Sequence, residues 1–177
     1  MIVWEAFKHR GIEYDLSHLH PSRIQYVQPK KADQPERIYT VEVCFSLHCF
    51  SRKLEPTADP LFNYGDARET RTFDIHRYEL SKQLPQIIQG LNFKKCMHTG
   101  KGNFFVIEVT TPNGVQEDYE VYFEVERSTT KGVVRLFVQS AYVRDQGHRN
   151  RPPSTKPISL FIILHNKLAG KPIKIQR

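Results

Sequence analysis

His48 is the residue of this chain best suited to acid–base chemistry. It stands near Ser46 on the polar face of a predicted strand, and Arg52 follows just beyond the end of that strand. Cleavage of RNA to a 2′,3′-cyclic phosphate needs a base for the 2′-hydroxyl, an acid for the leaving 5′-oxygen and cations around the phosphate. We therefore take His48 as the first candidate for the base.

Other side chains could share this chemistry. His98, or a glutamate on the polar face of a later predicted strand, is an alternative base. Arg52, Arg135 and Arg144 are candidates to hold phosphate, since a guanidinium can bind it through two parallel hydrogen bonds. The competing interpretations are that any one histidine is a hydrogen-bonded structural residue, and that Arg135 forms a cross-strand salt bridge with Glu124.

A zinc site is the second chemistry to consider, because the chain has three cysteines close to two histidines in sequence. Zinc would accept four ligands from Cys44, His48, Cys49, Cys96 and His98. On a strand that rises about 3.3 Å per residue, however, Cys44 and His48 lie about 13 Å apart, and Cys49 points the other way. No CxxC pair is present. We therefore expect buried, inert thiols and no bound metal.

Arg52 and four further arginines are candidates for contacts with nucleic acid. The segment Ser51–Phe73 loses the strand pattern and contains Pro56, Pro60 and Gly65, which predicts an irregular loop. Arginines on such a loop, beside a basic sheet, suit phosphate contacts, although they also suit an ordinary solvated surface. The residues assigned to this role are Arg52, Arg68, Arg71, Arg149 and Arg151.

The charge distribution points in the same direction. The net charge is +7, and residues 127–177 hold eleven Lys or Arg but one acid, Asp145. The first 126 residues are net negative, so the excess lies wholly in the C-terminal third. This asymmetry is typical of a protein that binds RNA or another polyanion, and a protein inhibitor or partner is a further candidate. The alternative is a solvated basic tail.

Composition sets the class of protein. A chain of 177 residues with 39% hydrophobic residues can bury a core without disulfides. Its longest apolar run, Leu160–Leu164, is far shorter than the roughly 20 residues of a membrane span, and no signal-peptide pattern follows Met1. We expect a cytoplasmic protein with reduced thiols. The GxGxxG, P-loop, HExxH and GxSxG motifs are absent, so we expect no cofactor.

The elements that must position these residues can be predicted from periodicity. Tyr39–Phe50 alternates as a half-buried strand. Asp74 is placed to cap a helix that runs to about Leu91 and is kinked or split at Pro85. Strands are predicted over 103–110, with a turn at Asn113-Gly114, and over 119–127, 133–144 and 158–166. The last is apolar on both faces; a helix ending at Gly170 is the competing interpretation.

The hairpin of 119–127 and 133–144 also has a predicted register. If Glu124 faces Arg135, one face of the hairpin is apolar and the other is polar with an opposed charge pair. A slip of one residue would spoil both faces. The predicted apolar pairs are Val125 with Val134, Phe123 with Leu136, and Val121 with Val138; the polar face pairs Tyr122 with Phe137 and Glu120 with Gln139.

A helix followed by four strands resembles the RelE/barnase/EndoU/colicin-type nuclease superfamily, which places helices ahead of a four-stranded antiparallel sheet. The stretch Leu136–Val143 is similar to the third-strand motif of many members, in which a small residue precedes an aromatic. The resemblance covers about residues 74–166. It implies catalytic residues on the sheet face and flanking loops, and by position Ser140, Tyr142 and Arg144 match the motif strand and its exit.

The sequence therefore predicts one α+β domain over 1–177, with a mainly antiparallel sheet of four to five strands and one kinked helix packed on it. Residues 1–73 are expected to form an N-terminal extension with a strand and a long loop, 74–166 the core, and 167–177 a basic tail. The functional hypothesis is a metal-independent, toxin-like endoribonuclease. The alternative is a non-catalytic module that binds nucleic acid or protein through the basic C-terminal third. The candidate catalytic residues are His48, Arg135, Tyr142 and Arg144.

Overall fold

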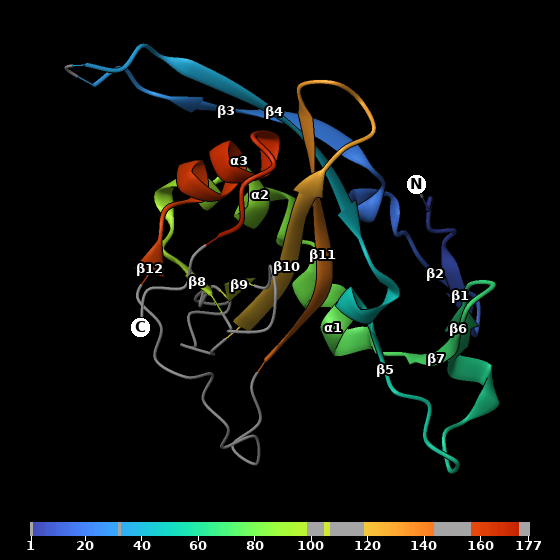
Figure 1. The fold of residues 1–177 in the computed structure, drawn as a ribbon. Coiled ribbons are helices and arrows are strands. Elements are labelled where there is room, and N and C mark those ends of the chain that lie inside the picture. Colours follow the sequence, from blue (N-terminus) through green and yellow to red (C-terminus); the bar gives the residue numbers. More distant parts are fainter. Residues whose placement is uncertain (1, 32, 99–104, 107–118, 144–156, 174–177) are drawn as a thin grey trace.

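A computed structural model describes residues 2–31, 33–98, 105–106, 119–143 and 157–173 of the chain (Figure 1). The protein is an α+β fold in which most strand pairs are antiparallel. The strands are β1 (Phe7–His9), β2 (Ile12–Tyr14), β3 (Ser22–Gln28), β4 (Arg37–Phe45), β5 (Ser51–Arg52), β6 (Asn63–Gly65), β7 (Thr70–Phe73), β8 (Cys96–His98), β9 (Phe105–Val106), β10 (Tyr119–Arg127), β11 (Val133–Val143) and β12 (Pro157–Ile158). The helices are α1 (Ile75–Ser81), α2 (Leu84–Gln89) and α3 (Leu160–Leu168).

The main sheet has the strand order β12-β8-β9-β10-β11-β4-β3. Its neighbouring strands are antiparallel except for β4 and β11, which are parallel. The sheet is therefore wider than the predicted four to five strands, because β3 pairs with β4 along its whole length and the short strands β8 and β12 extend the other edge. Residues 1–73 contribute β3 and β4 to this sheet and share its core, which contains Trp4, Phe7 and Leu16.

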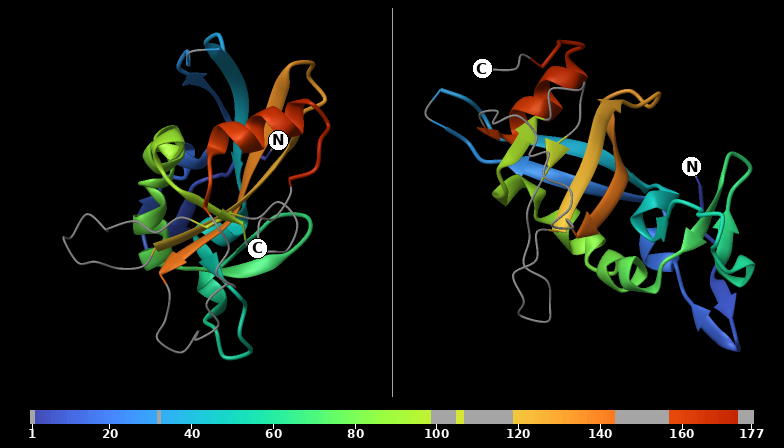
Figure 2. Two further views of the ribbon diagram at one scale, coloured as in Figure 1. Left: turned by 60° about the vertical axis from the view of Figure 1, so that its left-hand side comes forward. Right: turned by 90° about the horizontal axis from the view of Figure 1, so that it is seen from below.

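Two smaller sheets lie together at one end of the molecule, β1-β2 and β5-β7-β6 (Figures 1 and 2). They are joined by a cluster of aromatic rings around Phe73, which stacks on Phe7 at 4.1 Å between ring centroids and also contacts Tyr14 and Tyr78. The segment 51–73 was predicted to be an irregular loop. Most of it is irregular, as predicted, but it also contains the three short strands β5, β6 and β7, and Phe73 at the end of β7 fixes them to the core.

The predicted helix is split, as Pro85 suggested. α1 ends at Ser81, and α2 begins at Leu84 with Pro85 in its first turn, where a missing N–H costs nothing. Asp74 caps α1, since its Oδ1 accepts a hydrogen bond from the Arg77 N–H at 2.9 Å. Tyr26 of β3 donates to the Ile88 carbonyl of α2, which ties the helix pair to the sheet.

Replacing Asp74 with alanine should lower the free energy of unfolding by about 1 kcal/mol, because the Arg77 N–H loses its capping acceptor. Asp74→Asn should keep most of this stability, since an asparagine side chain also caps. Urea denaturation of the two variants measures the difference. An equal loss in both would show that the carboxylate charge, which lies 3.8 Å from Arg52, matters more than the cap.

The prediction of a strand over 158–166 was wrong, and the competing helix is present as α3. Leu160, Ile163 and Leu164 are buried at helical spacing, whereas Ile162 is 52% exposed. Gly170 follows with φ +67°, a left-handed conformation that glycine adopts without strain. α3 packs against β10 and β11. No helix in the described parts of the chain is long and apolar enough to cross a membrane.

The hairpin of β10 and β11 matches its predicted bounds but not its register. Glu126 lies opposite Arg135, Glu124 opposite Phe137 and Val125 opposite Leu136, which is a shift of two residues that keeps every side chain on its predicted face. A bulge at Gln139 then moves the pairing by one more residue, so that Tyr122 faces Ser140. Of the predicted strand 103–110, the structure describes only Phe105–Val106, which form β9. The predicted Asn113-Gly114 turn lies outside the described residues.

Candidate functional site

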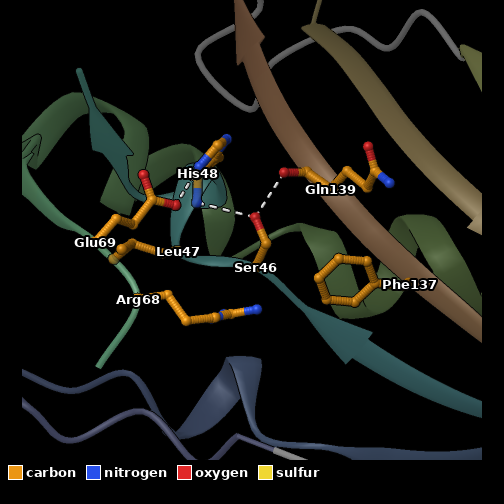
Figure 3. Close-up of a pocket in the computed structure, with 7 residues that line it drawn as sticks. All are labelled: Ser46, Leu47, His48, Arg68, Glu69, Phe137 and Gln139. Atoms are coloured by element: carbon orange, nitrogen blue, oxygen red, sulfur yellow. Dashed lines mark hydrogen bonds and ion pairs between the residues drawn. The ribbon is translucent and has the colours of Figure 1, made fainter. Parts of the chain in front are cut away.

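A pocket of about 350 Å³ opens on the polar face of the main sheet, between β11, the end of β4 and the turn joining β6 to β7 (Figure 3). Phe137 and Gln139 come from β11, and Arg68 and Glu69 come from the turn. The remaining lining residues follow β4 directly. They are Ser46, Leu47 and His48.

The predicted strand over 39–50 ends at Phe45, and this early end creates the pocket. Ser46 Oγ accepts the His48 N–H at 3.0 Å and donates to the Gln139 carbonyl at 2.6 Å. The Ser46 N–H donates to the Val138 carbonyl at 2.9 Å. The chain therefore leaves β4 in a 3₁₀ turn, Leu47–Cys49, that is held against β11. His48 lies on this turn and not on a strand.

His48 is paired with a carboxylate. Its Nε2 lies 2.7 Å from Glu69 Oε1, and the two side chains are 38% and 42% exposed. The hydrogen bond from His48 holds the pKa of Glu69 below its ordinary value, so Glu69 is ionised at neutral pH. Within the described residues Nδ1 of the same ring has no hydrogen-bond partner. An ionised carboxylate on one ring nitrogen fixes the ring orientation and leaves the other nitrogen for chemistry.

Glu69 is itself held by a chain of contacts. Arg71 Nη1 lies 3.4 Å from Glu69 Oε2, and Arg71 Nε donates to Ser51 Oγ at 3.0 Å. Ser51 Oγ in turn donates to the Leu47 carbonyl at 2.7 Å. A Cβ at Gly65 would lie 2.4 Å from the Glu69 carbonyl oxygen, so the tight approach of the two strands at this turn requires glycine.

The two predicted arginines of this turn are already engaged by carboxylates. Arg68 lines the pocket, but its Nη2 and Nε donate to Asp66 Oδ2 at 2.6 and 3.0 Å. Arg71 is half-buried and supports Glu69. Arg52 lies 3.8 Å from Asp74 at the start of α1. Phosphate binding by Arg68 would therefore require it to leave Asp66.

Arg135 is on the same face of β11 as Phe137 and Gln139 but does not line the pocket. Its Nη1 lies 3.2 Å from Glu126 Oε1, so the cross-strand ion pair exists with Glu126 and not with the predicted Glu124. Glu124 instead accepts from Gln139 Nε2 at 3.0 Å. Glu42, opposite Arg135 on β4, adds a second carboxylate near the guanidinium.

Tyr142 lies beyond the bulge and is separated from the pocket. Its ring stacks on Tyr122 at 5.6 Å, and the Arg77 guanidinium lies over it at 5.4 Å. Arg77 also donates to the Ser51 carbonyl at 2.8 Å and to the His48 carbonyl at 3.5 Å. Burial lowers the pKa of Arg77. Arg77 thus links Tyr142 to the turn that carries His48. No periodic pattern in the sequence indicates this role of Arg77.

Three predicted residues, Arg144, Arg149 and Arg151, lie outside the described residues. In the described parts of the chain, no three His, Cys, Asp or Glu side chains gather as a metal site. Cys44, Cys49 and Cys96 are buried free thiols. Burial raises the pKa of Cys49 and of Cys96 to about 12, so both remain protonated and unreactive.

Glu42 should make stability depend on pH. Its oxygens accept from Arg23 at 2.8 Å and from Ser128 at 2.9 Å, and these bonds hold its pKa below the ordinary 4.5. A lowered folded-state pKa contributes stability that is present above 4.5 and lost as pH falls through the folded value. Wild type should therefore exceed Glu42→Gln in unfolding free energy at neutral pH, with a gap that shrinks below pH 4.5.

Urea denaturation over this pH range measures the gap between the two proteins. Glu55, which is exposed, provides the control, since Glu55→Gln should show no such pH-dependent difference from wild type. A gap for Glu42→Gln that is constant with pH would contradict the assignment of the stabilisation to the ionised carboxylate.

Comparison with known proteins places the chain in a family. The model of the YjaZ family matches residues 6–168. Protein YjaZ of Escherichia coli (strain K12) is 32% identical over 173 residues, which cover 95% of this chain and 92% of that protein. No solved structure matches. The family match extends over β1 to α3, so it includes the pocket and the whole described sheet. The chain belongs to the YjaZ family.

Proposed function

We propose that this protein acts on RNA, as a metal-independent endoribonuclease whose base is His48. The observation that carries the proposal is the His48–Glu69 pair at 2.7 Å inside a pocket open to solvent. A histidine oriented by an ionised carboxylate is well suited to general-base catalysis. The basic C-terminal third supports the choice of a polyanionic substrate.

In the proposed reaction, His48 Nδ1 takes the proton of a ribose 2′-hydroxyl. The 2′-oxygen then attacks the adjacent phosphorus, and the bond from phosphorus to the 5′-oxygen breaks. The products are a 2′,3′-cyclic phosphate and a 5′-hydroxyl whose proton comes from an acid or from solvent. Tyr142 and Arg144 stay the sequence-based candidates for the acid and the phosphate cation: Tyr142 lies near the end of β11 and apart from the pocket, and Arg144 lies outside the described residues.

The order of elements supports the same proposal. α1 and α2 are followed by β8, β9, β10 and β11, each antiparallel to the next, which is the order of the nuclease superfamily that the sequence resembles. Fold likeness alone does not establish activity, so the proposal depends on the pocket.

Binding without cleavage is the second candidate, and one observation favours it. Arg68, which lines the pocket, and Arg71, which contacts Glu69, are both paired with carboxylates. If they stay paired, phosphate must be held by the basic C-terminal third, and the protein would grip RNA or an acidic protein partner there without cutting.

The two candidates are separated by incubating the protein with mixed RNA, folded tRNA and ribosomes in the presence of EDTA. Cleavage with 2′,3′-cyclic phosphate ends is expected. RNA that stays intact at high protein concentration would overturn the nuclease proposal. Binding would then be measured against salt, where contacts to several phosphates should cost roughly 10³–10⁵ in affinity between about 50 and 200 mM. An affinity independent of salt would favour a protein partner.

A further inference from the structure

A second groove, of about 370 Å³, lies between the β3–β4 hairpin and α3 and shares no lining residue with the His48 pocket. The hairpin extends past the other strands and runs beside α3 (Figures 1 and 2). Tyr39 in this groove and Ser46 in the His48 pocket are seven residues apart, which is about 23 Å of extended chain at about 3.3 Å per residue. The groove and the His48 pocket are therefore separate sites, one beside β4 and the other just after its C-terminal end.

The groove has an aromatic wall. Phe161 of α3 lines it and is half-buried, and its ring centroid lies 6.0 Å from that of the buried Tyr39. Tyr39 supports Phe161 from the sheet side, so the phenyl ring is backed by the core while part of it is open to the groove. A ring held in this way is a stacking surface for a planar ligand.

The polar lining consists of donors and amides. Arg37 Nη1 lies 3.1 Å from His165 Nδ1, and the guanidinium has no carboxylate partner among the described residues. Tyr39 donates its hydroxyl to Gln28 Oε1 at 3.1 Å, which fixes the Gln28 amide and leaves its NH₂ group to donate elsewhere. Gln34 and Asn166 supply two further amides.

The charge of the lining selects an anion. None of the described residues that line the groove is acidic; Asp33 and Glu36, in the same turn as Gln34, do not line it. This charge differs from that of the His48 pocket, where the lining arginine, Arg68, is paired with Asp66 and Glu69 also lines the wall. An unpaired arginine beside a histidine suits a phosphate, and amides next to an aromatic ring suit the hydrogen-bonding edge and face of a base.

We propose that this groove binds one nucleotide unit, with its phosphate on Arg37 and His165 and its base against Phe161. The volume is within the range of small-molecule sites. The unit could belong to a free mononucleotide or to a strand of RNA. The inference rests on the proposed function, since a nucleotide site suits a protein that acts on RNA. Mononucleotide binding is measured without any cleavage, so the nucleotide site and the nuclease activity can be refuted independently.

The test is calorimetric titration of the full chain with adenosine 5′-monophosphate, with adenosine and inorganic phosphate as half-ligands. The mononucleotide should bind more tightly than either half. Arg37→Gln should weaken mononucleotide binding by about 10-fold or more, because a hydrogen bond to a charged group is lost. Phe161→Leu, which keeps an apolar side chain against Tyr39, should weaken it by about 5-fold or more through loss of stacking.

The matched control is Arg10→Gln, which removes one exposed arginine from the β1–β2 turn and should leave binding unchanged. The proposal is overturned if the mononucleotide does not bind, if phosphate alone binds as tightly, or if Arg37→Gln and Phe161→Leu bind as wild type does. A single-stranded RNA whose binding is weakened by the same two variants identifies the strand as the source of the unit. If the two variants weaken mononucleotide binding but leave RNA binding unchanged, the ligand of the groove is the free nucleotide.

Discussion

His48→Ala is expected to lower the rate of RNA cleavage by about 10²–10⁴-fold, the usual contribution of a general base. The alanine variant removes the proton acceptor and leaves Glu69 with Arg71 as its remaining partner. The 3₁₀ turn itself should persist, because it is held by the backbone and by Ser46. Cleavage is measured on a short RNA with a fluorophore and a quencher, and folding is checked by circular dichroism.

His76 provides the matched control. It is an exposed histidine on α1, and His76→Ala should cleave RNA at the wild-type rate. The cleavage rate of Glu69→Gln should lie between those of His48→Ala and His76→Ala. Glutamine can still accept the hydrogen bond from His48 but carries no charge to stabilise the imidazolium. Wild-type cleavage by His48→Ala would remove this residue from the mechanism and leave binding as the better description.

Phe73→Ala should lower the free energy of unfolding by about 3–5 kcal/mol, as expected for a phenylalanine removed from a well-packed core. The ring is 2% exposed and lies among five aromatic rings, with Phe50 at 6.0 Å and Phe7 at 4.1 Å. Its loss leaves a cavity at the junction of the two small sheets with α1. Urea denaturation followed by circular dichroism measures the change.

The control is Phe93→Ala, because Phe93 is 87% exposed. This variant should stay within about 0.5 kcal/mol of wild type, as exposed substitutions usually do. Similar losses in the two variants would mean that the aromatic cluster around Phe73 contributes no more than a surface ring. Since β7 leads from Arg71 to Phe73, a loosened cluster should also weaken the hold on Glu69, and Phe73→Ala should cleave RNA more slowly than Phe93→Ala.

Alternation of apolar and polar residues, capping residues and proline were enough to predict the elements that are buried on one face and exposed on the other. The alternation in 119–127 and 133–144 gave β10 and β11 almost to the residue, and Asp74 with Pro85 gave the split helix. Alternation has a period of two and cannot detect a shift of two, so the register was missed. It is set by the turn, where the Ser128 N–H donates to the Val133 carbonyl and Gly132 adopts φ +79°.

The missed helix has a different cause. Leu160–Leu164 is apolar on every side and contains aromatic and β-branched residues, which are typical of a covered strand. One side of α3 packs against β10 and β11, and Phe161 on another side lines the groove beside Tyr39. More than one side of the helix is therefore covered by other residues. The helical spacing of Leu160, Ile163 and Leu164 leaves Ile162 off the buried face, but the aromatic and β-branched content outweighed this signal in the prediction.

The candidate site was predictable in part. Ser46 and His48 were recognised from their types, but the early end of β4 at Phe45 was not, because it depends on hydrogen bonds to Val138 and Gln139 about 90 residues away. Glu69 was not singled out among the residues of the predicted loop 51–73. Its role follows from the close approach at Gly65 and from Arg71, neither of which has a sequence signal of its own.

The parallel pairing of β4 with β11 has a consequence for how the chain folds. The two strands are neighbours in the sheet but about 90 residues apart in the sequence, since Thr40 lies opposite Val133. During synthesis, β4 can pair with β3 at once, but its other edge stays open until residues 133–138 have left the ribosome. Such long-range pairing folds slowly, and an open strand edge of apolar residues invites association with other chains. Nascent chains and truncated fragments that end before Val133 should therefore need chaperones. Once residues 133–138 are present, β11 pairs with the open edge of β4.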